Sequence, residues 1–272
     1  MEHLTCTKYY TVFSRNGIGG NKACVLLDKG YSRAEKKAVA KKVGFSETVF
    51  IKKLDCVYFL EFFTPEDEVE LCGHGTIAAV DYIIENFKDK PKIVMTKSGE
   101  IEIRYIDSII YIKLGNAEEI KTLFDIDMLS EATNLGKDKI EFQKMKPKIF
   151  KSGISDIIMP VRDYNSLMEI EIDRNKLINL SKTENVIGLH CFTIENGQIY
   201  ARNFAPLYGI DEESATGTSN NSVLHYLARE KLLPSNLGII IQGIYDDIGN
   251  VNYLYKDTFV YIGGEVIKID LL

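Results

Sequence analysis

Alternating apolar and polar positions run along much of the chain and predict a structure rich in β-strands. Ile101, Ile103 and Tyr105 alternate with charged or polar neighbours, which places the three side chains on one face of a strand. Shorter runs rich in Tyr, Val, Ile and Phe indicate further strands. The predicted strands of the first half are residues 5–13, 22–27, 49–51, 57–63, 92–97, 100–106 and 109–114.

Two segments of the first half have helical spacing instead. Residues 32–43 repeat small and apolar side chains at that spacing, and Gly44 follows as the terminating residue. The lysines at 36–37 and 41–42 are expected on the solvated face of this helix. A second helix is predicted over residues 75–86.

The second half repeats this order loosely. Asn196-Gly197 predicts a tight hairpin turn. The segment 115–119 is the best boundary and gives lobes at residues 1–116 and 117–272, with the final strand free to cross over to the first lobe. The predicted elements are helices at 128–135, closed by Gly136, at 175–180 and at 217–231, and strands at 149–151, 157–161, 186–194, 198–204, 239–242, 252–255, 259–262 and 266–269.

One short pattern occurs twice and explains why the halves look alike. The first copy is Phe63-Thr64-Pro65 followed by residues 70–76, and the second is Phe204-Ala205-Pro206 followed by residues 212–218. The Pro-containing parts lie 141 residues apart and the Gly-Thr parts 142, so one inserted residue explains the difference. Each copy leads into a helix. The chain therefore reads as two related, pseudo-symmetric halves.

Each copy of the pattern has the chemistry of an anion site. The first N–H groups of a helix lack intrahelical partners and carry partial positive charge, and two such ends facing one cavity would hold a carboxylate without Arg or Lys. The alternative is two ordinary helix starts that contain glycine. The residues expected to bind substrate are Cys72, Gly73, Gly75, Thr76, Ser214, Gly217 and Thr218.

Composition narrows the class of partner. With 33 basic and 39 acidic residues the chain offers no general attraction to nucleic acid or anionic lipid. No run approaches the roughly 18 apolar residues of a membrane span, and the N-terminus lacks the apolar core of a signal peptide. Five cysteines without paired spacing fit reduced thiols. We therefore expect a cytoplasmic protein that acts on a small molecule, without a metal site or a phosphate-binding loop.

A series of motifs, in order over nearly the whole chain, resembles the PhzF-like family of phenazine-biosynthesis isomerases. The resemblance implies an α+β, diaminopimelate-epimerase-like fold of two domains, each a mostly antiparallel sheet wrapped around a central helix, with the site at their interface. It also implies no cofactor and a homodimer. The motifs are Gly20-Asn21, residues 46–50, Phe63-Thr64-Pro65, residues 72–76, Ser152-Gly153, Phe204-Ala205-Pro206, residues 213–218 and Gln242-Gly243.

The resemblance assigns roles to three polar residues. The family's glutamate, which removes and redelivers a proton on a cyclic dihydroxylated amino acid, falls on Glu47, while His74 and Glu213 resemble its other polar site residues. From the residues alone, Ser46 and Thr48 are placed to orient Glu47. Nearby Phe45 and Phe50 are expected to raise its affinity for a proton.

Departures from the family pattern leave alternatives open. Glu213 stands where the family has Asp, Ser214 where Pro is common, Thr218 where Ser is usual and Cys72 where a small or apolar residue is common. Racemases and epimerases of this fold use a thiol in each turn. A helix N-terminus would lower the pKa of the Cys72 thiol, but Ser214 removes the second thiol, and Cys72 also reads as a packing residue.

The expected function is cofactor-independent proton transfer at carbon in a small, amino-acid-like carboxylate, with Glu47 as general acid and base. The alternatives are a racemase, epimerase or dehydratase based on Cys72, and a non-catalytic small-molecule-binding or scaffold protein.

Overall fold

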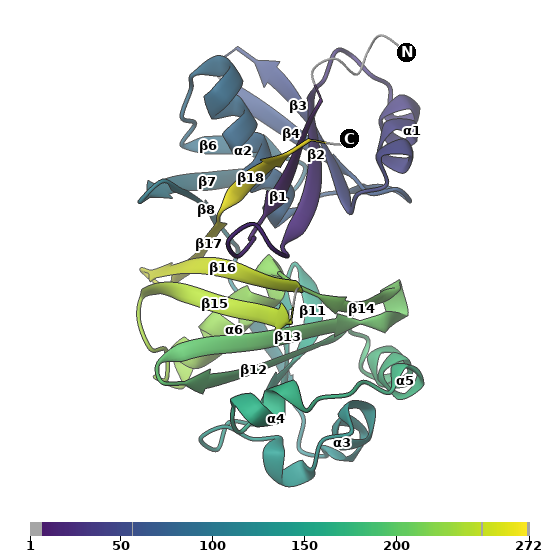
Figure 1. The fold of residues 1–272 in the computed structure, drawn as a ribbon, viewed down its shortest axis with the longest axis vertical. Helices are drawn as coiled ribbons and strands as arrows, with labels where there is room; N and C mark the ends of the chain where they lie inside the picture. Colours follow the sequence, from purple (N-terminus) through teal and green to yellow (C-terminus); the bar gives the residue numbers. More distant parts are fainter. Residues whose placement is uncertain (1–6, 56, 246, 271–272) are drawn as a thin grey trace. The chain divides into compact units, whose positions relative to one another are not determined.

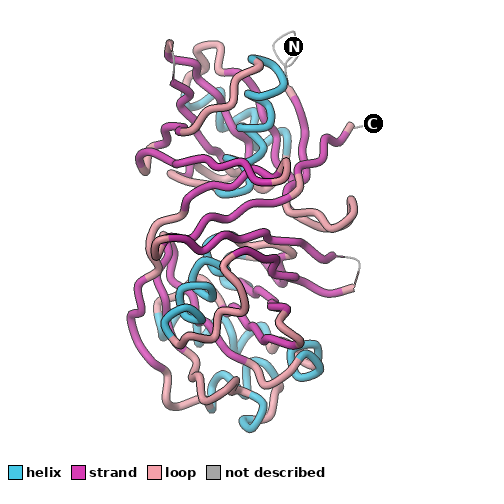
Figure 2. Tube along the Cα trace, turned by 90° about the vertical axis from the view of Figure 1, so that its left-hand side faces the viewer, coloured by secondary structure: helices cyan, strands magenta, loops and turns pink. Residues whose placement is uncertain are grey.

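The computed structural model describes residues 7–55, 57–245 and 247–270, so the first two residues of the predicted strand 5–13 lie outside the described part. The chain divides into two compact units, Met1–Lys113 with Tyr261–Leu272, and Leu114–Val260. Figure 1 labels their elements, and Figure 2 shows that strand predominates over helix in both. Among the described residues, no helix is long and apolar enough to cross a membrane.

The first unit is a mostly antiparallel sheet with two parallel pairings. Strands β1 and β2 pair antiparallel, β2 and β3 parallel, β3 and β4 antiparallel, β4 and β6 parallel, and β6 and β7 antiparallel. The elements are β1 (Lys8–Val12), β2 (Asn21–Leu27), α1 (Arg33–Val43), β3 (Glu47–Leu54), β4 (Val57–Phe63), β5 (Glu68–Val69), α2 (Gly73–Phe87), β6 (Ile93–Thr96), β7 (Gly99–Ile106), β8 (Ile109–Lys113), β17 (Phe259–Gly264) and β18 (Val266–Ile269).

The second unit repeats this pairing order strand for strand. Strands β10 and β11 pair antiparallel, β11 and β12 parallel, β12 and β13 antiparallel, β13 and β15 parallel, and β15 and β16 antiparallel. Its strands are β9 (Glu118–Thr122), β10 (Lys148–Ser152), β11 (Ile154–Pro160), β12 (Leu189–Glu195), β13 (Gln198–Ala205), β14 (Ile210–Glu213), β15 (Leu237–Ile244) and β16 (Asp247–Lys256), and its helices are α3 (Asp127–Thr133), α4 (Tyr164–Met168), α5 (Arg174–Glu184) and α6 (Gly217–Arg229), with 3₁₀ turns at Lys137–Lys139 and Pro206–Tyr208.

The matching order confirms the predicted fold class of two pseudo-symmetric halves. Each half places one helix directly after a short strand, α2 after β5 and α6 after β14, and most of that helix is buried. Ile77, Val80 and Ile83 of α2 are fully buried, as are Val223, Leu224 and Leu227 of α6. A helix with so little exposed surface is the centre of a core rather than a cover on it.

Two strands of the first half of the chain pair with the last two strands of the chain. β1 pairs with β18 and β8 pairs with β17, both antiparallel, so residues from both ends of the sequence complete the first unit. Leu114 N–H donates to the Val260 carbonyl at 3.0 Å beside the point where the chain re-enters this unit. The final strand therefore belongs to the first unit.

Helix α1 confirms its sequence prediction at both ends. Ser32 accepts from the Glu35 N–H, Glu35 accepts from the Ser32 N–H, and Gly44 ends the helix with a φ of 72°. These contacts form a capping box at the start and a left-handed cap at the end.

The spacing of the four lysines of α1 predicted that all of them lie on one solvated face. This prediction was wrong for Lys36. Lys36 is 5% exposed, and its ammonium forms ion pairs with Asp28 at 2.7 Å and with Glu61. It also lies 5.5 Å from the centre of the Phe50 ring. The long aliphatic stem lets the Lys36 ammonium reach the carboxylates of Asp28, which follows β2, and of Glu61 on β4, whereas Lys41 and Lys42 are exposed as expected.

Several other boundaries in the predictions were wrong, among them the end of α6, which lies at Arg229 and not at 231, and both ends of β3, which spans Glu47–Leu54 and not 49–51. Helix α2 begins at Gly73, two residues before the predicted start, and α5 runs to Glu184 rather than ending at 180. Helix α3 ends at Thr133, and the next residue, Asn134, supplies with a φ of 51° the left-handed cap that the prediction gave to Gly136. The short elements β5, β9, β14 and α4 were not predicted. The Asn196-Gly197 hairpin is confirmed, with φ of 51° and 78°.

Candidate active site

The N-terminus of α2 forms the centre of the candidate site in the first unit. Cys72 is the N-cap, and its sulfur accepts a hydrogen bond from the Gly75 N–H at 3.3 Å. Because the helix begins at Gly73, His74 lies in the first helical turn. The Thr76 hydroxyl donates to the Cys72 carbonyl at 2.7 Å, so this hydroxyl is used inside the helix.

The two glycines of this turn have different surroundings. A Cβ on Gly75 would lie 3.0 Å from Val49 and 3.3 Å from Phe62, so the missing side chain lets α2 pack closely on β3 and β4. A Cβ on Gly73 would meet only Ile112, at an ordinary 3.6 Å. The ligand-binding roles predicted for both residues remain predictions.

Glu47 and His74 form the polar centre of this turn. Glu47 opens β3, which pairs parallel with β2, and its Oε2 lies 2.9 Å from Nε2 of His74. The His74 side chain is 9% exposed and that of Glu47 18%. Ser46 Oγ lies 3.3 Å from the same His74 nitrogen and donates to the Lys22 carbonyl at 3.1 Å. Strand and helix thus bring two of the three predicted catalytic residues into contact.

The residues predicted to orient Glu47 and to raise its pKa are only partly those that surround it. Ser46 contacts His74, as described, but Thr48 follows Glu47 on β3 and therefore points to the opposite face of the strand. Phe50 lies on that opposite face too, where it packs in the core beneath α1 with Phe63, and Phe45 packs against this same core. Figure 1 shows α1 and α2 on opposite sides of these strands.

The ion pair reverses the predicted pKa shift of Glu47. Burial by itself raises the pKa of this carboxyl, but the charge of His74 and hydrogen bonds from neighbouring side chains outweigh burial and hold the pKa below its ordinary value. Burial disfavours the His74 cation, yet its interactions with Cys72 and Glu47 raise its pKa well above the usual value. The resting pair is therefore a carboxylate and an imidazolium.

The pKa of the Cys72 thiol is raised, whereas the sequence predicted that it would be lowered. Burial is the main cause and raises its pKa, the negative charge of Glu47 raises it further, and the opposing effects of His74 and the Gly75 N–H are smaller. Its sulfur lies 3.5 Å from Nδ1 of His74. The partial charge of one helix end does not compensate for burial next to a carboxylate, so the neutral thiol is favoured.

Among the residues that the structure describes, one group of side chains could hold a metal ion. It consists of Glu47, Cys72 and His74. One oxygen, one sulfur and one nitrogen lie within 4.8 Å of one another. In this arrangement Glu47 and His74 already neutralise each other, and the thiol is favoured over the thiolate that a metal ligand requires. A metal ion at this position would therefore have to displace the His74–Glu47 ion pair and deprotonate the Cys72 thiol.

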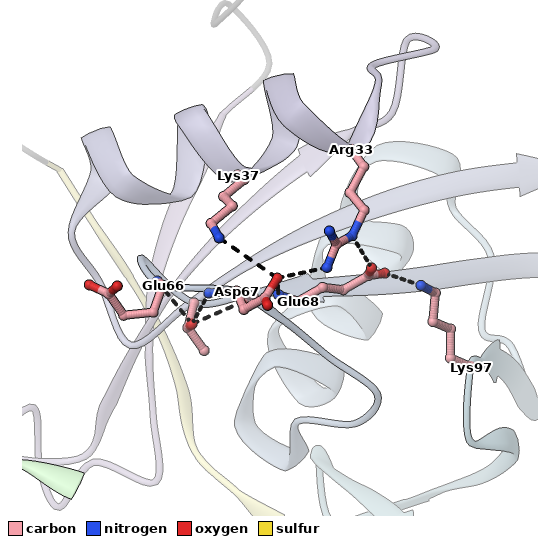
Figure 3. A network of polar contacts seen from close by, with 7 residues as sticks. Arg33, Lys37, Glu66, Asp67, Glu68 and Lys97 are labelled. Atoms are coloured by element: carbon pink, nitrogen blue, oxygen red, sulfur yellow. Dashed lines mark hydrogen bonds and ion pairs between the residues drawn. The ribbon is translucent and has the colours of Figure 1, made fainter.

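The loop that leads to this turn is held by charged groups (Figure 3). The Thr64 hydroxyl donates to the Asp67 carbonyl and accepts from the Asp67 N–H, both at 3.0 Å. The Glu68 side chain is 7% exposed and pairs with Arg33 at 3.1 Å and Lys97 at 2.6 Å. These contacts tie the segment before Cys72 to α1 and to the β6–β7 turn.

The corresponding turn of the second unit is organised by Gln242 of β15. Its side-chain amide donates to the Glu213 carbonyl at 2.7 Å and to the Thr216 hydroxyl at 3.0 Å, and its oxygen accepts from the Thr216 N–H at 3.1 Å. The Thr216 hydroxyl donates to Oε2 of Glu213 at 2.9 Å. The third predicted catalytic residue is therefore fixed by its own turn.

The predicted binding residues of this second turn lie where the sequence placed them. Gly217 and Thr218 open α6, as predicted, and both are partly exposed, whereas Ser214 is 5% exposed. Their ligand-binding roles, and the expectation that the turns of both units hold one carboxylate, remain predictions.

A buried carboxyl next to this turn was not predicted from the sequence. Asp156 is 4% exposed and accepts a hydrogen bond from Ser219 at 2.7 Å. Burial raises its pKa to about 6, and the charge of Glu213 adds to the shift. The carboxylate form of Asp156 is thus less favourable in the folded protein than in the unfolded chain.

This shift predicts a pH dependence of stability. The folded pKa of Asp156 lies above the unfolded value of 3.8, so its contribution to stability is largest below about pH 4 and is lost as pH rises to about 6. The loss is about 3 kcal/mol at about 1.4 kcal/mol per unit. Asp156→Asn is expected to remove it. Urea unfolding at pH 4.5 and 7.5 measures the change, and the exposed Asp257→Asn serves as control. Equal pH dependence in both variants would contradict this assignment.

A chain of buried amide and imidazole groups around Glu213 was also missed. His190, Asn220 and Gln242 are fully buried, and Asn203 is 6% exposed. The signal in the sequence is a run of four polar residues, 219–222, directly after the Gly-Thr pair in a helix whose remaining positions are largely apolar. Such a run inside a central helix predicts a polar partner opposite it.

Comparison with known proteins places this geometry in a family. The model of the family described as phenazine biosynthesis-like protein matches residues 10–253. The chain belongs to the phenazine biosynthesis-like (PhzF) family. The uncharacterized isomerase YfhB of Bacillus subtilis is 29% identical over 99% of this chain and 100% of that protein. The chain is accordingly an isomerase of this family.

Solved structures confirm the fold. The PhzF-family protein of Bacillus anthracis matches with a TM-score of 0.82 at 22% identity, covering 97% of each chain. A hydroxyproline epimerase from Agrobacterium vitis matches with a TM-score of 0.61 at 8% identity, covering 98% of this chain and 92% of the other. The PhzF-family member therefore shares its α+β, epimerase-like fold with enzymes that act on amino acids.

Proposed function

We propose that the chain is a cofactor-independent isomerase that moves a proton at carbon in a small, amino-acid-like carboxylate, with Glu47 as general acid and base. The observation that carries this proposal is the buried ion pair of Glu47 Oε2 and His74 Nε2, 2.9 Å apart at the first turn of α2. It supplies an ionised base and a charged hydrogen-bond donor in one place.

The proposed reaction uses this pair in two steps. In the first, the Glu47 carboxylate takes a proton from a substrate carbon, so the C–H bond breaks and an O–H bond forms. The electron pair stays on the substrate, where the His74 imidazolium stabilises developing negative charge. In the second step the Glu47 carboxyl returns a proton to a different carbon. Glu213 is proposed as the third polar group of the reaction.

The substrate class follows from the helix ends. The N-terminal N–H groups at Gly73 and at Gly217 favour a carboxylate, and the Thr218 hydroxyl is available beside the second. An amino-acid-like substrate and a homodimeric, cytoplasmic enzyme are part of the same proposal. The assembly state can be measured by sedimentation.

The Cys72-based alternative gives a distinct prediction. Loss of a catalytic base costs about 100-fold or more in rate, whereas the raised pKa of the buried Cys72 thiol makes it a poor base. We expect Cys72→Ser to keep the N-cap and at least about a tenth of the wild-type turnover. A loss of turnover as large as that of Glu47→Gln would favour the thiol mechanism instead.

Heavy-water exchange tests the proposed function itself. Wild-type protein is incubated in deuterium oxide with a panel of amino acids that includes cyclic and hydroxylated ones, and carbon-bound deuterium is measured by mass spectrometry. A proton on Glu47, whose side chain is 18% exposed, can exchange with solvent before it is returned. Deuterium in one or more compounds supports the proposal, whereas binding of these compounds without any exchange supports a scaffold.

A further inference from the structure

The side chains of Glu47, Cys72 and His74 bring an oxygen, a sulfur and a nitrogen together in the first unit. No other group of three or more Cys, His, Asp or Glu side chains in the described part of the chain places its ligand atoms within 4.8 Å of one another. Thiolate, imidazole and carboxylate are the ligands that zinc uses in proteins. Magnesium and calcium bind through oxygen instead, so the donor set favours a thiophilic cation.

The distances around Nε2 of His74 are close to the spans across a zinc ion. Nε2 lies 2.9 Å from Oε2 of Glu47 and 3.8 Å from Sγ of Cys72. In a tetrahedron with zinc bonds of about 2.0 Å to nitrogen and oxygen and about 2.3 Å to sulfur, these two pairs of atoms lie about 3.3 Å and about 3.5 Å apart. The two distances therefore have to change by only about 0.4 Å and about 0.3 Å to accept the ion.

Two neighbouring elements hold the three side chains. Glu47 is the first residue of β3, Cys72 is the N-cap of α2, and His74 lies in the first turn of that helix. Helix and strand are closely packed here, since a Cβ on Gly75 would lie only 3.0 Å from Val49. Ligands that are presented by a strand and a helix keep their geometry better than ligands on loops.

One oxygen of this group has no hydrogen bond. Oε2 of Glu47 lies 2.9 Å from Nε2 of His74, but the contact is not aligned as a hydrogen bond. Within the described part of the chain this buried oxygen has no hydrogen-bond partner. Buried polar atoms without a partner are uncommon in folded proteins, and a bound ion is one of the recurring reasons for them. Oε2 is thus available to a cation that also binds Nε2 and Sγ.

The exchange of two protons for one zinc ion leaves the net charge of this buried group unchanged. In the resting protein the Glu47 and His74 charges cancel, and the Cys72 thiol is neutral. On binding, the S–H and Nε2–H bonds break, bonds from zinc to Sγ, Nε2 and Oε2 form, and two protons leave to water. No oxidant or reductant is needed. A metal ion deprotonates the thiol that binds it, and the Gly75 N–H, 3.3 Å from the sulfur, stabilises the thiolate.

We propose that Glu47, Cys72 and His74 form an inhibitory site for a thiophilic divalent cation, with Zn²⁺ as the ion that fits it and water as the fourth ligand. The inhibition rests on the proposed function, because the bound ion takes up the carboxylate and the imidazole that the proton transfer uses. The binding itself is a property of the resting protein. The ion is an inhibitor here and not a cofactor, and Cys72 makes the site sensitive to it.

Titration with Co²⁺ tests the site without any substrate. Co²⁺ accepts the ligands of Zn²⁺, and it is coloured, since tetrahedral coordination gives strong visible bands and a thiolate ligand adds a charge-transfer band in the near ultraviolet. The wild-type protein is kept reduced by a phosphine. We expect both kinds of band to appear and saturate, to disappear when Zn²⁺ is added, and to persist in excess Mg²⁺. A titration without the charge-transfer band would overturn the proposal.

Single substitutions assign the bands to this site. The chain has 5 cysteines, so Cys72→Ser is compared with Cys24→Ala, which removes a fully buried thiol of β2 in the same unit. Cys72→Ser is expected to lose the charge-transfer band. By calorimetry, Cys72→Ser and His74→Gln are each expected to bind Zn²⁺ about 100-fold more weakly or worse, because losing even a partner behind a metal ligand costs about 10- to 100-fold. Cys24→Ala should match the wild type, and a charge-transfer band that persists in Cys72→Ser would overturn the proposal.

Turnover tests the inhibitory role. With the compound that shows deuterium exchange, Zn²⁺ is expected to lower the initial rate of the wild type in proportion to the fraction of protein that carries the ion. For the same fractional loss of its own rate, Cys72→Ser should need about 100-fold more Zn²⁺. A wild-type protein that keeps its rate when saturated with Zn²⁺ would overturn the inhibitory role. If no compound shows exchange, the proposed function fails, and the Co²⁺ spectra still decide whether the site binds metal.

Discussion

Replacing Glu47 with Gln is expected to lower kcat by about 100- to 10,000-fold while leaving the fold intact, since this is the range that general acid–base catalysis contributes. Gln has the shape of Glu and can still accept from His74, but it cannot take a proton from carbon. The corresponding increase in the activation barrier is about 3 to 5 kcal/mol. Initial rates with the compound that shows exchange give the measurement.

The control for this variant is Glu70→Gln. Glu70 precedes Cys72 by two residues and is exposed, so the same chemical change is made on the same loop outside the ion pair. Both proteins should unfold at similar urea concentrations. If Glu70→Gln lost as much activity as Glu47→Gln, or if Glu47→Gln kept wild-type kcat, the catalytic role of Glu47 would be excluded.

Replacing Lys36 with Met is expected to destabilise the fold by about 3 to 5 kcal/mol, the cost of leaving a buried charge without its partner. The Lys36 side chain is 6% exposed and sits between Asp28 and Glu61. Burial raises the pKa of Asp28, but hydrogen bonds from Lys36 and from the Gly30 and Tyr31 N–H groups lower it overall. Removing the ammonium leaves two carboxylates facing each other, and chemical unfolding measures the loss.

Lys37→Met is the matched control for Lys36. Its side chain is 44% exposed and lies 3.9 Å from Asp67, so we expect a change within about 0.5 kcal/mol. Adding Asp28→Asn to Lys36→Met should restore part of the stability, because one uncompensated carboxylate is then gone. Equal effects of the two lysine variants would show that the Lys36 ion pairs contribute little.

Local signals in the sequence predicted the fold where they were strong. The predicted helix over residues 32–43, ended by Gly44, matches α1 with its N-cap at Ser32, and Asn196-Gly197 closes its hairpin as predicted. The element β5 was missed because its two residues are too few to show an alternating pattern, and it is a strand only through its pairing with β4. The start of α2 was placed late because Cys72 is an uncommon N-cap and the repeat aligns Gly75 with Gly217, although the two helices begin at different points of the repeat.

The site was predictable in identity but not in electrostatics. Family resemblance led to Glu47 and His74, and the structure brings them together. The direction of the Glu47 pKa shift was wrong because it depends on which strand face each neighbour occupies, and Phe50 lies on the other face. His190 was passed over because its hydrogen-bond partners, Asn203 on β13 and Asn220 on α6, come together only in the folded protein.

The pH dependence of kcat/KM in wild-type protein and in His74→Gln tests most directly the claim that the ion pair keeps Glu47 ionised as the base. The ordinary pKa of a glutamate is 4.5, and that of Glu47 is lowered by His74. The account predicts that wild-type activity falls only below this value and that the fall moves to higher pH in His74→Gln. An acid limb at the same pH in both proteins would contradict it.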